Sequence, residues 1–176
     1  MDEFDDPFAD DQDQPQMDPD DTAGDGPGLD PGNLLLIVTG AHLRAEQADR
    51  PLAQRLQKRI ETWVHRHDNA LDDPLLPVSC CDLWYLNQPT LQRRPTISIG
   101  GPGVNALSAY FYRRLDPALV RDKQLIIQLD PEFVDLRVCL WGPDHQRTAE
   151  ALEIFMRRFL DGFLRAVATQ VEPQID

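Results

Sequence analysis

Apolar residues gather in short runs that predict the strands of a sheet. The first run, residues 34–38, is uninterrupted and ends at Thr39-Gly40, which is typical of a strand covered on both faces. Further strands are predicted at 78–81, 96–99, 125–129 and 134–141. Only residues 130–133 separate the last two runs, too few for a crossover helix, so we expect these strands to form an antiparallel hairpin.

Other apolar residues recur every three or four positions, the period of an amphipathic helix. A first helix is predicted from about Pro51, after a loop at 41–51 in which Asp49 is the expected N-cap. A second helix follows Asn105, and a long third one runs from about His145 to Val167. The apolar positions of the third helix are Leu152, Phe155, Met156, Phe159, Phe163 and Val167.

The order of these elements is β-α-β-β-α-β-β-α, which is typical of the α/β class. We therefore expect one three-layer α/β domain at 33–170, with a mostly parallel sheet, a C-terminal β-hairpin and a long C-terminal helix. Residues 1–32 are expected to be a disordered acidic tail, because they contain few residues that could be buried.

A glycine-rich loop joins the strand at 96–99 to the second helix, with the sequence GGPGVN at 100–105. Such a loop can present backbone N–H groups to an anion at a helix N-terminus. It matches neither G-x-G-x-x-G nor the P-loop pattern, and Pro102 has no N–H to donate. Two interpretations stay open. The loop is a tight turn capped by Asn105, or an anion site formed by Gly100, Gly101, Gly103 and Asn105 with Arg44 as charge partner.

Polar residues follow several of the predicted strands, where an open α/β sheet binds its ligands. Asp82 follows the second strand, and Asp144 and His145 follow the last. Asp144 is either an N-cap or an acid/base group, and the dipole of the helix that begins near His145 favours a neutral histidine base. His145 and Asp144 are therefore the candidate catalytic residues, although no motif supplies a nucleophile. The adjacent Cys80 and Cys81 lack the ligand spacing of a zinc site, so no metal is expected, and the sequence indicates no particular cofactor.

Charge is distributed very unevenly along the chain, whose formal net charge is -13. Residues 1–32 contain 12 acids and no Lys or Arg, whereas the remainder has 18 acids and 17 bases. A nearly neutral body argues against nucleic acid as a partner, and the acidic tail would repel an anionic membrane surface. The tail either solubilises the protein or, through Phe4 and Phe8, forms a short motif that binds a partner.

The expected compartment is the cytoplasm. The first residues do not resemble a signal peptide, and the longest apolar run, 34–38, is too short to span a bilayer. The three cysteines are an odd number in apolar surroundings, which is typical of buried reduced thiols.

Two strand–turn–helix junctions carry a resemblance to a known family. They are G-G-P-x-x-N at 100–105 and G-x-D-x-x-x-T-x-x-A at 142–151, the latter following Trp141. In spacing and order they resemble the α/β, Rossmann-like domain of archaeal S-layer-type proteins, over residues 34–167. The resemblance implies that fold and a non-catalytic role for both turns. It does not imply a cell-envelope function, because we expect neither a leader nor a membrane anchor from this sequence.

Two functions follow as hypotheses. The first is a binding or interaction module without a catalytic set, which engages a protein partner through its tail or its glycine-loop edge. The second is an enzyme or sensor for a small anionic ligand, phosphorylated or nucleotide-like, bound at the glycine loop.

Overall fold

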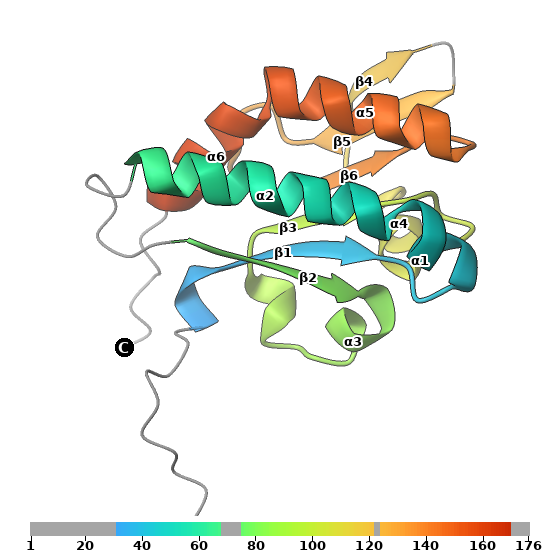
Figure 1. The fold of residues 1–176 in the computed structure, drawn as a ribbon, viewed down its shortest axis with the longest axis horizontal. Coiled ribbons are helices and arrows are strands. Elements are labelled where there is room, and N and C mark those ends of the chain that lie inside the picture. Colours follow the sequence, from blue (N-terminus) through green and yellow to red (C-terminus); the bar gives the residue numbers. More distant parts are fainter. Residues whose placement is uncertain (1–30, 68–74, 122–123, 170–176) are drawn as a thin grey trace, which may run out of the picture.

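A six-stranded sheet forms the centre of the computed structural model, which describes residues 31–67, 75–121 and 124–169 (Figure 1). The strands lie in the order β2-β1-β3-β6-β5-β4. Their bounds are β1 Leu34–Thr39, β2 Leu76–Cys81, β3 Thr96–Ile99, β4 Pro117–Arg121, β5 Leu125–Leu129 and β6 Arg137–Trp141. Strands β2, β1, β3 and β6 pair in parallel, whereas β5 is antiparallel to both β6 and β4. The predicted α/β class and mostly parallel sheet are confirmed. Of the expected acidic tail at 1–32, residues 1–30 lie outside the described residues, and residues 31 and 32 belong to a short 3₁₀ helix.

Helices cover both faces of this sheet (Figure 1). Helices α2 (Arg50–His67), α5 (His145–Arg158) and α6 (Leu160–Thr169) pack on one face. The shorter α3 (Asp82–Leu86) and α4 (Ala106–Phe111) pack on the other, while α1 (Leu43–Ala48) follows β1. Two short 3₁₀ helices, η1 (Pro31–Asn33) and η3 (Leu91–Arg93), complete the described elements.

Strand β1 shows how the apolar run is used. Leu35 and Ile37 belong to the core beneath α2 and α5, whereas Leu36 and Val38 belong to the core beneath α3 and α4. Successive side chains of a strand point to opposite faces, so an uninterrupted apolar run fills two cores at once.

The strand order places a topological switch point between β1 and β3. The chain leaves β1 for β2 on one side and returns past β1 to β3 on the other. The loops after β1 and β3 therefore lie next to each other at the carboxyl edge of the sheet, the usual position of a ligand crevice in this class.

The structure corrects the interpretation of residues 41–51 as a loop, because α1 forms there. The imidazole of His42 accepts a hydrogen bond from the N–H of Arg44 and caps this helix. Asp49 ends α1, and its carbonyl accepts from the N–H of Ala53 as α2 begins. A helix of only six residues is stabilised by its cap and by contacts with α2 rather than by a long apolar period, so hydrophobic periodicity does not predict it.

Strand β4 was also missed. It pairs with β5 alone at the border of the sheet, and its side chains are partly or fully exposed. Without a buried face it shows no alternation of apolar and polar residues. Pro117 fits there because the first residue of an edge strand need not donate to the ladder.

The predicted long C-terminal helix is divided at Phe159, whose backbone angles are φ −121° and ψ −27°. A straight helix of 23 residues would span about 35 Å, roughly twice the length of a five-residue strand. The break redirects α6, so that Phe163 and Val167 reach the core. Phe159 itself is only partly buried, whereas Phe155 and Phe163 are fully buried.

Candidate functional site

The side chain of Asp82 ties together three loops at the carboxyl edge. Its Oδ1 accepts hydrogen bonds from the N–H groups of Ala41 and Leu83, each at 2.8 Å, and its Oδ2 accepts from the N–H of Ala106 at 2.7 Å. These donors follow β1, follow β2 and begin α4, respectively. Asp82 is buried, so a group expected on the rim of a cleft is instead used to hold the loops in place.

Asn105 uses both ends of its amide inside the fold. The Oδ1 atom accepts from the N–H groups of Leu107 at 2.9 Å and Ser108 at 3.2 Å. The Nδ2 atom donates to the Ile99 carbonyl at 2.9 Å, to Ser98 Oγ at 3.1 Å and to the Val38 carbonyl at 3.3 Å. Since the residue is only 1% exposed, this geometry supports the helix-cap interpretation and leaves no group for a ligand.

Two glycines at this edge, Gly40 after β1 and Gly100 after β3, lie too close to other protein atoms for a Cβ. A Cβ placed on Gly40 would lie 1.8 Å from the carbonyl oxygen of Val104, so the loops after β1 and β3 are in direct backbone contact. Gly100 has φ +105°, and a Cβ there would lie 2.4 Å from Asp49 Oδ2. Only glycine fits at either position. The crevice expected at the switch point is therefore closed by the chain.

Asp49, expected as the N-cap of the helix that follows residues 41–51, ends α1 instead, and no cap hydrogen bond among the described residues involves its carboxyl group. Its carboxyl group is buried against Gly100 and makes no hydrogen bond within the described residues. Burial raises the pKa of this carboxyl, and the charge of His145 acts in the opposite direction. An acidic side chain against the loop disfavours an anion at that point.

The other predicted ligand residues of the loop differ in exposure. The carbonyl of Gly101 accepts from the N–H groups of Val104 and Asn105, both at 3.0 Å, which closes the turn. Gly103 is exposed, with nothing within 4 Å of the position that a Cβ would take. Arg44 is exposed on α1, and its guanidinium makes no ion pair in the ranges that the structure describes. The structure does not show these groups converging on a cavity.

The two candidate catalytic residues lie at the start of α5. Oδ1 of Asp144 accepts from the N–H of Arg147 at 2.8 Å, so this residue is the N-cap of the helix. His145 is exposed as the first helical residue. Behind them, Thr148 Oγ1 accepts from the N–H of Gly142 at 3.1 Å and donates to the Asp144 carbonyl at 3.0 Å. These bonds account for the order of residues in the second junction without requiring a substrate.

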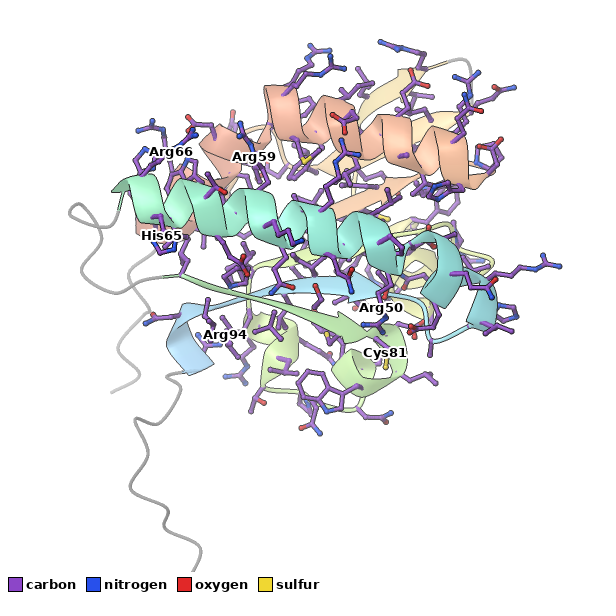
Figure 2. All side chains as sticks on the ribbon, viewed as in Figure 1. Arg50, Arg59, His65, Arg66, Cys81 and Arg94 are labelled. Carbon is purple, nitrogen blue, oxygen red and sulfur yellow. The ribbon has the colours of Figure 1, made fainter. Side chains whose placement is uncertain are left out.

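Beside this edge, Arg50 forms a bidentate ion pair with Glu46: Nε donates to Oε2 and Nη2 donates to Oε1, each at 2.5 Å. The hydrogen bond from Arg50 lowers the pKa of Glu46. Arg50 lies close to Cys81, which is half-buried at the end of β2 (Figure 2). Cys80 and Cys139 are buried free thiols, and burial raises the pKa of each to about 12, so both stay protonated at neutral pH.

Large apolar side chains, by contrast, are exposed around the loops that Asp82 joins. Leu43 begins α1 and is 70% exposed, while Leu83 and Trp84 of α3 are 56% and 47% exposed. Tyr110 of α4, a helix in contact with α3, is 45% exposed. We call these four residues the apolar edge. Leu83 and Trp84 directly follow a predicted strand, and the sequence pattern does not distinguish exposed apolar residues from buried ones at that point.

No protein-family model matches the chain, and no curated protein matches it. Within the described residues, no helix has the length and apolar character needed to cross a bilayer. No three His, Cys, Asp or Glu side chains come together there as a candidate metal site.

Proposed function

We propose that this chain is an interaction module that binds a protein partner through the apolar edge. Leu83 donates its N–H to Asp82, and Trp84 follows it in α3. Leu43 lies two residues after Ala41, which also donates to Asp82, so these exposed side chains belong to segments that Asp82 holds together. Tryptophan and tyrosine side chains contribute disproportionately to binding at protein interfaces, where they are buried on association.

A single contrast carries this proposal. At the same edge, the polar side chains of Asp82, Asn105 and Asp144 hold backbone N–H groups, while large apolar side chains face solvent. A small-molecule site has the opposite arrangement, with a mostly apolar cavity and a few unsatisfied polar groups directed into it.

The alternative function, an enzyme or sensor for a phosphorylated ligand, receives less support. Asn105 has no free hydrogen-bonding group, and the Asp49 carboxyl occupies the space beside Gly100. His145, Asp144 and Arg44 would have to act on a ligand held outside the loop. The resemblance to the S-layer-type α/β domain also favours a non-catalytic role for both turns.

We also propose a cytoplasmic location for this module. Free, buried Cys80 and Cys139 are suited to a reducing compartment. We propose that the antiparallel strands β5 and β6 are the C-terminal hairpin expected from the sequence.

Quantitative affinity capture from the cells that produce the protein tests the proposed function. Immobilised wild-type chain is compared with Leu83→Ser/Trp84→Ser and with the matched control Val120→Ser/Val134→Ser, which also removes two exposed apolar side chains. We expect a partner to be retained by the control and lost with the first variant. A partner that both variants retain equally would contradict the assignment of the apolar edge.

A thermal-shift screen with nucleotides and phosphorylated metabolites tests the alternative. We expect no compound to raise the melting temperature. A compound that stabilises the wild type but not Arg44→Glu or His145→Ala would favour the small-molecule function, because both side chains are exposed and their loss leaves the fold intact.

A further inference from the structure

Positive charge in the folded part is concentrated on one helical layer. Helices α2, α5 and α6 together carry nine Lys and Arg side chains against four acids. Residues 1–30 carry twelve acids and no Lys or Arg. The folded part is therefore nearly neutral overall but has a basic face. The same chain also carries a strongly acidic segment.

An open groove of about 660 Å³ lies between α2 and the pair α5 and α6 on this layer. Its lining residues are Arg55, Lys58, Arg59, Thr62, Glu153, Met156, Arg157 and Asp161. We call it the basic groove. The position of Arg59 on the outer surface of α2, with Arg66 further along the helix, is visible in Figure 2.

The two acids of the basic groove are already paired. Glu153 forms an ion pair with Arg55. Asp161 accepts from Arg165 Nε at 2.8 Å and from Trp63 Nε1 at 2.9 Å.

Three cations of the groove stay available. Lys58, Arg59 and Arg157 are exposed and form no ion pair among the residues that the structure describes. The groove thus presents three neighbouring positive charges without carboxylate partners, a surface complementary to a chain of carboxylates.

The acidic segment is attached within reach of this surface. It joins the described part at Pro31, where η1 leads into β1. This is the end of the molecule at which α2 finishes with Arg66 and His67 (Figures 1 and 2). Thirty residues span up to about 100 Å when extended, several times the length of an 18-residue helix of about 27 Å. A short tether of this kind holds a segment at an effective concentration of about millimolar.

We propose that residues 1–30 bind in the basic groove of their own chain, with their carboxylates paired to Lys58, Arg59 and Arg157. The association covers a surface that an external acidic partner would otherwise occupy. It depends on salt, because the Debye length falls from about 10 Å at 0.1 M to about 3 Å at 1 M ionic strength.

Paramagnetic relaxation enhancement on the full-length chain tests this proposal. A nitroxide is attached at Asp11→Cys in a Cys81→Ser background, where Cys80 and Cys139 are buried. At low salt we expect the amide signals of residues 55–62 and 153–161 to lose at least half of their intensity, and to recover in 1 M NaCl. Uniform broadening, or broadening centred on α4, would overturn the proposal.

Two charge reversals provide the matched comparison. The groove variant is Lys58→Glu/Arg59→Glu/Arg157→Glu, and the control is Arg93→Glu/Arg113→Glu/Arg114→Glu, three exposed arginines outside the groove. Both change the net charge equally, and only the first should abolish the broadening. Equal loss in both variants would show a general charge effect and contradict the groove. If the groove variant does not fold, the milder Arg59→Gln/Arg157→Gln, with Arg113→Gln/Arg114→Gln as control, is used for the same comparison.

A mixing experiment separates the chain's own segment from that of a second copy. Isotope-labelled chain without nitroxide is mixed with unlabelled chain that carries it. We expect no broadening in the mixture, and broadening there as strong as in the single chain would reassign the occupant to another copy. The outcome is independent of the apolar edge, which lies on other elements.

Discussion

At the scale of single residues, Asn105 makes more hydrogen bonds than the helix cap that the sequence predicts. A cap alone requires only a side-chain acceptor, so aspartate or serine would be acceptable replacements. The structure adds three acceptors around Nδ2, namely the carbonyls of Val38 and Ile99 and the hydroxyl of Ser98. The residue must therefore donate as well as accept.

We predict that Asn105→Asp destabilises the protein at least as much as Asn105→Ala, by about 3 kcal/mol, because a buried carboxylate would face two carbonyl oxygens. Urea unfolding at pH 7 measures the difference. Stability equal to the wild type in Asn105→Asp would show that Nδ2 contributes nothing, and Asn105→Ser provides a comparison that retains an acceptor.

Asp49 leads to a prediction about pH. An acid whose pKa is raised in the folded state stabilises the protein only while it is protonated, below its unfolded value near 3.8. That contribution is lost as the pH rises through the pKa of the folded state. The ionised carboxylate therefore lowers the stability of the folded protein relative to the protonated form. We therefore predict that Asp49→Asn, whose new side chain is uncharged, has a higher melting temperature than the wild type at pH 7.

The difference between these two proteins should shrink as the pH falls through the raised pKa of folded Asp49 towards 3.8, because the carboxyl group in the folded protein then becomes neutral, as the Asn side chain is. Melting curves between pH 3.5 and pH 7 are the measurement, with about one pH unit between points. A wild type that is more stable than the variant at pH 7 would indicate that the charged carboxylate has a favourable partner.

At the scale of elements, the division between α5 and α6 gives different burial to Phe155 and Phe159, which both lie on the apolar face of the predicted helix. Phe155 is fully buried and lies edge-on to Phe163, with ring centroids 6.1 Å apart. Phe159 occupies the break and is only partly buried.

We therefore predict that Phe155→Ala costs about 3–5 kcal/mol of unfolding free energy and Phe159→Ala less than half as much. Chemical denaturation of both variants provides the comparison. Equal losses would mean that the break does not move Phe159 out of the core, and that the two helices act as one.

At the scale of the whole molecule, the sequence was informative wherever burial imposes a period. The two-sided β1 run and the apolar face of α2, with Leu52, Leu56 and Ile60, determine the class of fold. Elements without a buried period escaped detection. Strand β4 is an exposed edge, and α1 has only Ala45 buried.

The candidate site could be located from the sequence but not interpreted. Strand ends and capping residues indicate the carboxyl edge, whereas the use of Asp82 depends on donors that are 41 and 24 positions away along the chain. The same is true of Asp49, whose contact with Gly100 arises only when α2 packs against the sheet. Contacts between distant segments leave no local pattern.

The shared carboxylate of Asp82 has a consequence for local unfolding. Ala41, Leu83 and Ala106 donate to one side chain, so releasing that side chain exposes three amides from three segments together. Native-state hydrogen exchange should therefore show these amides opening with one common free energy, as a single cooperative unit. Asp82→Ala should accelerate the exchange of all three by a similar factor. The edge that would meet a partner thus becomes ordered, or loses its order, in one step.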